Sequence, residues 1–266
     1  MSIPSLRPLD RAAGAVRTEL YRSGNLLVVG VLPFGSRSVA ITFCPWAPQP
    51  TLDQPGFGEA FLIKYGIDAI HVICRDNGWY QYDDTGAALD AAVAHAAPYA
   101  NKVAMGWSMG GYAAINFSQY LGVDRVIAVS PQFSGDPAKV PFETRWSRDR
   151  RAIRFRHDRI DTLARDGRQV WVLFDDRHSI DRRHVELIRA RLNVIELALP
   201  HSGHPAGAIL ASLGMLANTV TRMIEGNLDR EEFAAELRQL QASRKDARWS
   251  LLRRGASRLF RSAADR

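Results

Sequence analysis

The sequence has few cysteines and no long apolar run. Its 266 residues include only Cys44 and Cys74, which form neither a CxxC pair nor a dense framework, so they predict buried thiols rather than a zinc site or a disulfide scaffold. No apolar stretch approaches the ~20 residues that a membrane-spanning helix needs. The first 20 residues carry charges where a signal peptide is apolar. We therefore expect a cytoplasmic location.

The positive charge of the chain is concentrated in one segment. The formal net charge is +7, and residues 243–266 hold eight Lys or Arg and two Asp, so this segment carries +6 of it. The rest of the chain is nearly neutral. This distribution argues against a globally basic protein that binds nucleic acid.

Eight short runs have the character of strands. Two alternating runs, 15–23 and 25–32, are joined by turn residues and predict a β-hairpin. Six more runs resemble strands buried on both faces of a parallel sheet: 39–44, 68–74, 102–107, 125–130, 169–174 and 193–199. Helical spacing lies between them at 56–66, 85–99, 109–122, 181–192 and 205–226. This alternation predicts the α/β class, with an eight-stranded, mostly parallel sheet covered by helices on both faces.

One interval breaks this alternation. Residues 132–168 separate two predicted strands by more than one helix and contain an Arg-dense run at 145–159. We interpret the interval as an excursion over the top of the sheet. A solvated loop with a short helix explains it equally well, since charge runs usually face water.

The run at 102–107 leads into a candidate nucleophile. Residues 106–110 read Gly-Trp-Ser-Met-Gly and match the G-x-S-x-G pattern, with a strand-like run before and a helix-like run after. A serine on such a tight turn has strained backbone angles, and the glycines leave room for neighbouring chain segments. The pattern predicts Ser108 as the nucleophile. The weaker alternative is a serine that only caps the helix.

A serine nucleophile requires a general base and an acid that orients the base, in the chain order Ser, Asp or Glu, His. We predict His204 as the base because small and turn-forming residues flank it, and His201 is the alternative. Asp175, directly after the run at 169–174, is the predicted acid, with the adjacent Asp176 as the alternative. Asp181 is better explained as a helix N-cap.

Further site residues follow from this arrangement. The backbone N–H of Met109 is the natural first oxyanion donor because it follows the nucleophile. The second donor should come from the loop after 39–44, where Trp46 is the candidate neighbour. Trp79 and Tyr80 are candidates for stacking on a sugar face, although aromatic residues there pack the loop as often.

Several of these features together resemble the α/β-hydrolase fold over about residues 14–225: the eight runs, the GWSMGG turn, the acid after the next-to-last strand and the SGH loop. More narrowly, the segments NGWYQYDD, SMGGYAA, RVIAVSPQ and FDDRHSIDRRH resemble bacterial hydrolases associated with polysaccharide or cell-surface glycan modification. This resemblance implies an esterase or acyltransferase acting on glycan O-acyl groups, with the last two segments bordering the site. The oxyanion loop and the short acid loop depart from the commonest esterase pattern, which leaves the substrate class and the acid open.

The leading hypothesis is a serine hydrolase, a carboxylesterase or deacylase that forms an acyl-Ser108 intermediate. His204 would take the serine proton while Asp175 holds the imidazole. This chemistry needs no metal or organic cofactor, and its partner is a small-molecule or glycan acyl ester. The alternatives are an O-acyltransferase with the same triad and a catalytically silent α/β-hydrolase-like protein in polysaccharide biosynthesis, because a fold does not guarantee activity.

The sequence divides into a catalytic domain at 1–226 and a helical, basic C-terminal extension at 227–266. Apolar residues such as Trp249 and Phe260 interleave with arginines in the extension, a composition compatible with an amphipathic helix on an anionic membrane surface. That reading implies a peripheral location at the inner membrane surface. A dimer contact or a solvated tail explains the composition equally well.

Overall fold

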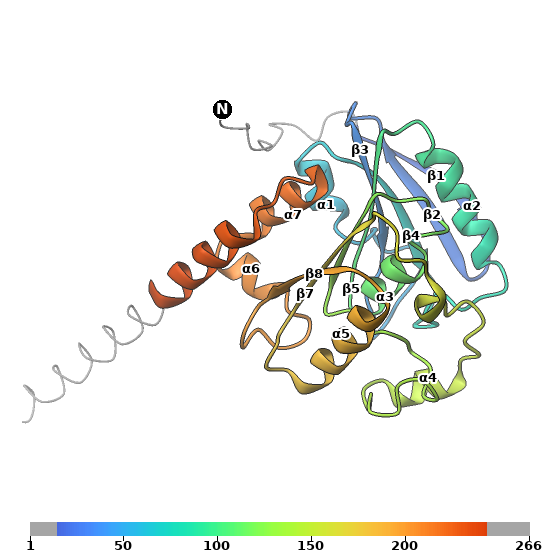
Figure 1. The fold of residues 1–266 in the computed structure, drawn as a ribbon. Coiled ribbons are helices and arrows are strands. Elements are labelled where there is room, and N and C mark those ends of the chain that lie inside the picture. The colour runs from blue at the N-terminus through green and yellow to red at the C-terminus, as the bar shows by residue number, and fades with distance from the viewer. Residues whose placement is uncertain (1–14, 244–266) are drawn as a thin grey trace, which may run out of the picture.

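A twisted central sheet with helices on both sides forms the framework of the protein (Figure 1). The computed structural model describes residues 15–243. The eight strands lie in the order β1-β2-β4-β3-β5-β6-β7-β8. Their bounds are β1 (Val16–Arg22), β2 (Leu26–Leu32), β3 (Ser38–Phe43), β4 (Asp68–Cys74), β5 (Asn101–Trp107), β6 (Arg125–Val129), β7 (Gln169–Phe174) and β8 (Val194–Ala198).

The strand directions agree with the sequence pattern. β2 pairs antiparallel with β1 and β4, and every other neighbouring pair is parallel. The predicted eight-stranded, mostly parallel sheet is therefore confirmed. Because parallel strands end at the same edge, the loops after β3, β5, β6, β7 and β8 meet at one edge of the sheet.

Helices bury both faces of the sheet. The bounds are α1 (Glu59–Lys64), α2 (Thr85–Ala96), α3 (Met109–Asn116), α4 (Ser147–Ala152), α5 (Ser179–Arg191), α6 (Ala208–Ser212) and α7 (Leu216–Glu225). Apolar residues of α2, α3 and α5 share one core cluster with residues such as Ile41 and Ala104. The opposite core cluster joins α1, α6 and α7 to residues such as Ala40 and Val103. Successive residues of β3 and β5 thus serve opposite faces, as strand geometry dictates.

The single long helix expected over 205–226 is two helices. α6 ends at Ser212 and α7 begins at Leu216, and between them Gly214 has a φ of 76°. This left-handed conformation is open to glycine but costly for most residues, and it ends α6. The prediction of one continuous helix was wrong because it did not treat this glycine as a helix terminator.

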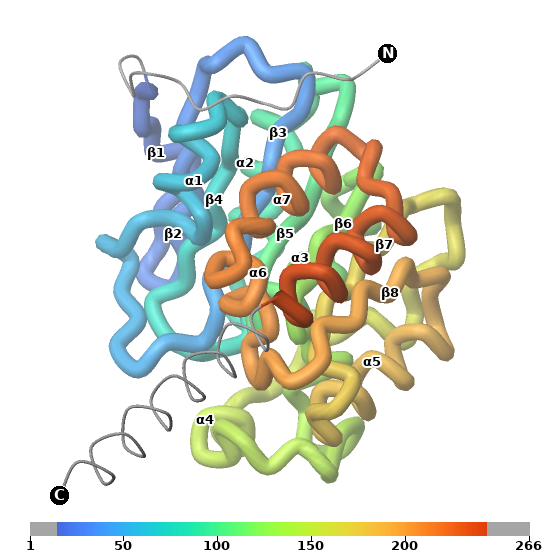
Figure 2. Tube along the Cα trace, turned by 90° about the vertical axis from the view of Figure 1, so that its left-hand side faces the viewer, coloured from blue at the N-terminus to red at the C-terminus, as the bar shows by residue number. Residues whose placement is uncertain are grey.

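The first part of the C-terminal extension packs on the sheet. Residues 230–243 are helical, and Phe233 and Leu237 are buried in the same cluster as α7. Figure 2 shows this helix, in dark red, crossing in front of β7 and β8. The basic residues 244–266, with Trp249 and Phe260, lie outside the described residues. No helix in the described part of the chain combines the length and the hydrophobicity that crossing a bilayer requires.

Candidate active site

Ser108 lies on a sharp turn between β5 and α3. Its backbone has φ 52° and ψ −119°, a left-handed φ that is uncommon for a residue other than glycine. A Cβ on Gly110 would lie 2.2 Å from the backbone oxygen of Phe43, and a Cβ on Gly106 would lie 2.4 Å from the backbone of Gly110. The two glycines of the G-x-S-x-G pattern are therefore required by backbone atoms that approach where a side chain would be.

The structure brings Ser108 and His204 together. His204, from the loop after β8, has its Nε2 atom 2.9 Å from Ser108 Oγ. The hydroxyl is nearly buried, and the imidazole is 12% exposed. The alternative histidine, His201, is exposed, and its backbone N–H donates to Asp175 instead. Of the two histidines, only His204 has the geometry of a general base for Ser108.

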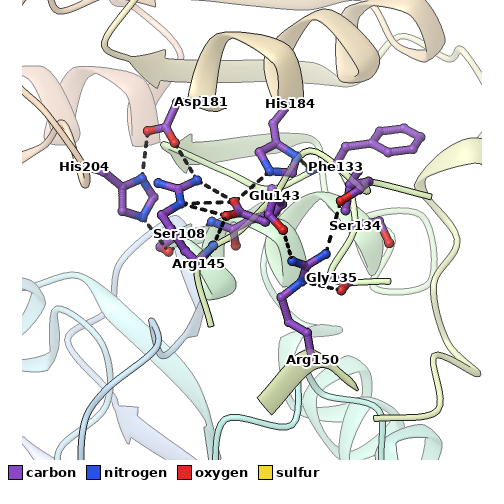
Figure 3. Close-up of polar contacts among 12 residues, drawn as sticks. Ser108, Phe133, Ser134, Gly135, Glu143, Arg145, Arg150, Asp181, His184 and His204 are labelled. Carbon is purple, nitrogen blue, oxygen red and sulfur yellow. Dashed lines mark hydrogen bonds and ion pairs between the residues drawn. The ribbon is translucent and has the colours of Figure 1, made fainter. Parts of the chain in front are cut away.

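The carboxylate that contacts His204 belongs to Asp181 rather than Asp175. His204 Nδ1 lies 2.7 Å from Asp181 Oδ2 (Figure 3). Because a carboxylate only accepts, Nδ1 carries the proton, and Nε2 is left to accept from the Ser108 hydroxyl. The expected contact of Asp175 with the imidazole is thereby corrected.

Asp175 instead holds the backbone of its surroundings. Its Oδ1 accepts the N–H groups of Arg177 at 2.9 Å and His201 at 3.0 Å, and its Oδ2 accepts the N–H of Gly203 at 2.8 Å. Burial tends to raise the pKa of Asp175, but these backbone hydrogen bonds outweigh burial and lower it. Asp175 therefore fixes the loop that carries His204. The alternative acid, Asp176, lies 3.8 Å from Arg177.

Asp181 lies in the first turn of α5 but does not cap it. The N-cap residue is His178, whose Nδ1 accepts the backbone N–H of Asp181 at 3.2 Å. The Asp181 side chain is 1% exposed and is free to face His204. The N-cap interpretation of Asp181 was wrong because the helix begins at Ser179, two residues before the aspartate.

A second buried acid and an arginine extend this arrangement. Arg145 Nη2 lies 2.8 Å from Asp181 Oδ1 and 2.6 Å from Glu143 Oε2. The buried Glu143 also contacts His184 Nε2 at 3.0 Å. Burial tends to raise the pKa of Asp181, but the hydrogen bond and charge of His204 and the charge of Arg145 outweigh it and lower the pKa. Sequence reasoning missed Glu143 and Arg145, whose only signal was the Arg-dense interval before β7.

One buried amide contacts Ser108 directly. Gln132 follows β6 and is fully buried, and its Nε2 donates to Ser108 Oγ at 3.1 Å. Ser108 Oγ thus accepts from Gln132 while its own proton points to His204. The segment RVIAVSPQ had been expected to border the site, and Gln132 is its last residue.

The predicted oxyanion donors differ in their surroundings. Met109 is the first residue of α3, so its N–H belongs to the first helical turn, which has no intrahelical acceptor. The indole N–H of Trp46 donates to Asp149 Oδ2 at 2.8 Å, so this N–H is already engaged by a carboxylate. A role for the backbone of Trp46 stays a prediction.

The two candidates for stacking on a sugar do not lie at the surface. Trp79 and Tyr80 are both fully buried, and the Tyr80 hydroxyl donates to the backbone oxygen of Cys44. Their rings pack the loop and present no face for a sugar. The partly exposed Trp146 ring lies 5.5 Å from the His204 ring and 6.1 Å from the Trp46 ring, measured between centroids. The aromatic ring that contacts His204 is therefore that of Trp146, which in turn contacts Trp46.

Two cavities are lined partly by residues of the interval 132–168, and neither is lined by Ser108, His204 or Asp181. A cavity of about 590 Å³ is lined by polar residues that include Asn77, Asp83 and Arg156, together with Asp149, the acceptor of the Trp46 indole. A second cavity of about 260 Å³ is bordered by Glu143. The described residues contain no group of three or more His, Cys, Asp or Glu side chains arranged to hold a metal ion.

Comparisons with known proteins agree with this architecture. No protein-family model and no curated protein matches the sequence. The chain is similar to the capsule O-acetyltransferase of Neisseria meningitidis serogroup A, with 11% identity, 83% of this chain and 98% of that chain covered, and a TM-score of 0.55.

Two further solved structures show the same likeness. Alpha/beta hydrolase domain-containing protein 10 from mouse has 12% identity, covers 80% of this chain and 99% of its own, and gives a TM-score of 0.53. An esterase from Pyrococcus furiosus has 14% identity, with 85% and 98% covered and a TM-score of 0.53. The chain therefore has the α/β-hydrolase fold, and on it Ser108, His204 and Asp181 form a continuous line of hydrogen bonds.

Proposed function

We propose that the protein is a serine acyl hydrolase that acts through an acyl-Ser108 intermediate. The observation that carries the proposal is the line from Ser108 Oγ through both nitrogens of His204 to Asp181, with distances of 2.9 and 2.7 Å. A hydroxyl, an imidazole and a buried carboxylate in this order provide nucleophile, general base and orienting acid.

In the first step, Ser108 Oγ attacks the carbonyl carbon of an acyl ester while its proton moves to His204 Nε2. The imidazole becomes positively charged, and Asp181, which accepts the Nδ1 proton in a hydrogen bond, stabilises that charge. The tetrahedral intermediate then collapses. His204 returns the proton to the leaving alcohol, and the acyl group stays on Ser108.

In the second step, water attacks the acyl-Ser108 ester. His204 Nε2 takes a proton from this water, and the collapse of the second intermediate releases the acid and returns the proton to Ser108 Oγ. The backbone N–H of Met109, at the start of α3, would donate to the oxyanion formed in each step. Gln132 Nε2 directs the Ser108 hydroxyl proton toward His204 by donating to its oxygen.

The substrate we propose is an O-acyl group on a glycan. The partly exposed Trp146 ring beside His204, with the Trp46 ring packed against it, supports a sugar ring there, because aromatic faces pack on the apolar faces of sugars. The polar cavity that includes Asp149 offers hydrogen-bonding groups suited to hydroxyls. The similar Neisseria protein is named a capsule O-acetyltransferase, which agrees with this substrate class.

A second candidate is an O-acyltransferase that uses the same three residues. The chemistry differs only in the group that attacks acyl-Ser108, which is a sugar hydroxyl instead of water. The likeness to the named O-acetyltransferase favours this variant. The product ratio distinguishes the two: with an acetyl ester donor and an acceptor glycan, a hydrolase releases free acetate at a rate independent of acceptor, whereas a transferase forms acetylated glycan at the expense of acetate.

Reaction with a fluorophosphonate probe tests the proposal itself. We expect the wild-type protein to be labelled at Ser108, because only an activated serine reacts, and the Ser108→Ala variant to be unlabelled and inactive on short-chain acyl esters. A folded wild-type protein that neither reacts nor hydrolyses any ester would instead support the catalytically silent alternative.

A further inference from the structure

The excursion between β6 and β7 places an arginine directly behind the acid of the triad. Asp181 Oδ2 contacts His204 Nδ1, and Asp181 Oδ1 lies 2.8 Å from Arg145 Nη2. The side chain of Asp181 is almost completely buried. Its two oxygens therefore face one imidazole and one guanidinium, and water has little access to replace either partner.

The same arginine also binds a second buried carboxylate, that of Glu143. Arg145 Nε donates to both carboxylate oxygens of Glu143, at 3.0 Å to Oε1 and 3.1 Å to Oε2. Arg145 Nη2 donates to Glu143 Oε2 at 2.6 Å, and the backbone N–H of Arg145 donates to Oε1 at 2.8 Å. The planar guanidinium thus bridges two carboxylates, which a lysine ammonium cannot do with the same geometry.

Glu143 is held in turn by a histidine of fixed tautomer. The backbone N–H of Phe133 donates to His184 Nδ1 at 3.1 Å, so the His184 proton is on Nε2 and points to Glu143 (Figure 3). Burial lowers the pKa of His184, although Glu143 partly opposes the effect. Burial tends to raise the pKa of Glu143, but hydrogen bonds from His184 and Arg145 lower it to about 2. Glu143 is therefore ionised and His184 neutral near pH 7.

We infer that Arg145 and Glu143 are positioning residues for the acid of the triad: Arg145 fixes Asp181, and Glu143 offsets the positive charge of Arg145 so that Asp181 still attracts the imidazolium. The inference rests on the proposed function. It also gives the excursion a role in the chemistry, since it supplies both residues.

The charge balance explains why two residues are needed. Arg145 alone would neutralise Asp181 and remove the attraction that stabilises the charged His204. With Glu143 present, the buried group of Asp181, Arg145 and Glu143 keeps a net charge of one negative unit. The other titratable or charged groups that face these three side chains are His204 and His178, which both contact Asp181, His184, which contacts Glu143, and the buried Arg150. The Arg150 guanidinium donates to the backbone oxygen of Glu143, and its charge interacts with those of Glu143 and Arg145. Substitutions at Arg145 or Glu143 leave the charge of Arg150 in place, so the signs of the expected pH shifts do not depend on it.

The test is the pH dependence of kcat/KM for ester hydrolysis in single variants of the full-length protein. Glu143→Gln removes a negative charge and should move the acidic limb, where His204 becomes protonated, to lower pH. Arg145→Met removes a positive charge and should move the same limb to higher pH. The double variant Arg145→Met/Glu143→Gln should return the limb close to its wild-type position, because the two charges cancel.

The effect on rate separates positioning from binding. Arg145→Met should lower kcat ~10- to 100-fold with little change in KM, the loss expected when a supporting group lets the reacting geometry relax. Arg145→Lys keeps the positive charge but loses the planar guanidinium that bridges the two carboxylates. Its kcat should therefore lie between those of Arg145→Met and the wild type, and its acidic limb should stay near the wild-type position. The matched control is Arg148→Ala, an exposed arginine of α4, which should change neither quantity.

Each result decides the inference. Limb shifts of opposite sign for Glu143→Gln and Arg145→Met support it, whereas lower activity with an unmoved limb would show a purely structural role. If Arg145→Met does not fold, the near-isosteric Glu143→Gln decides the question by the same readout. Wild-type protein that fails to react with the fluorophosphonate probe overturns the proposed function itself, whereas labelled protein with unmoved limbs overturns only this inference.

Discussion

Two buried aspartates six residues apart do different work in this molecule. Asp175, at the end of β7, gives its oxygens to three backbone N–H groups of neighbouring loops, while Asp181, in the first turn of α5, gives its oxygens to an imidazole and a guanidinium. Both carboxyl groups have a lowered pKa. The difference teaches that position at a strand end does not decide which aspartate contacts the imidazole of His204. The partners of the carboxylate do.

The largest expected effect comes from Asp181→Asn. The amide would donate to His204 Nδ1 and favour the tautomer with its proton on Nε2, which cannot accept from Ser108. By analogy with triad aspartates in serine proteases, we expect kcat/KM for short-chain esters to fall by about a thousandfold or more. The measurement is steady-state hydrolysis together with the rate of fluorophosphonate labelling.

If Asp181→Asn kept a tenth of the wild-type activity, the contrast between the two aspartates would be lost. A thermal melt on the same sample ensures that a lower rate reflects the altered hydrogen bond rather than unfolding.

Asp175→Asn should act mainly on stability. The amide keeps one acceptor oxygen but places an NH2 group where the other carboxylate oxygen accepts, so at least one of the three backbone N–H groups loses its acceptor. This loss costs about 1–3 kcal/mol in the free energy of unfolding. We expect a smaller loss of kcat/KM, about tenfold, because the loop of His204 is held less firmly. Urea unfolding and steady-state kinetics at pH 7 measure the two effects.

The pH dependence of that stability difference has a definite sign. The folded-state pKa of Asp175 is lowered from its ordinary value of 3.8, so its charged form stabilises the fold above that value. This contribution is lost as pH falls through the lowered pKa. The gap in unfolding free energy between wild type and Asp175→Asn should therefore be largest near neutral pH and shrink below pH 3.8. A gap that widens in acid contradicts this account.

The smallest effects should come from the residues that were alternatives in the sequence. His201 is exposed with a φ of 62°, a conformation that asparagine also tolerates. We expect His201→Asn and Asp176→Asn each to change activity by no more than about twofold, the range of surface substitutions away from special features. A large loss of activity in either variant, measured with the same esters, would reopen the choice of base or acid.

The sequence was sufficient to predict the sheet, the turn at Ser108 and the approach of His204 to Ser108. These follow from short-range rules: apolar runs define the buried strands, and the glycines of the turn are needed because backbone from β3 and α3 occupies the space of their side chains. The strand ends alone could not identify the acid. A strand end fixes where a backbone emerges, but the orientation of Asp175 depends on N–H groups donated by Arg177, His201 and Gly203.

The contacts of Glu143 and Arg145 with the candidate site could not be predicted from sequence periodicity. They lie in an irregular segment 36 or more residues before Asp181 in the sequence, so no spacing rule relates the three. Trp79 and Tyr80 show a second limit of sequence patterns. Their aromatic character is equally compatible with a surface for sugar and with packing of the loop, and only the structure, in which both rings are buried, selects packing.

The close fit around Gly110 has a consequence for how the protein could change. Ser108 is located by main-chain atoms of β3, β5 and α3, whereas Trp146 and Arg145 reach the site from an irregular segment. In a directed-evolution library aimed at new substrates, most variants with a randomised turn would therefore lose the position of Ser108. Substitutions at the exposed residues Thr144 and Ser147 of the segment would leave Ser108 in position, so more of the variants should remain active.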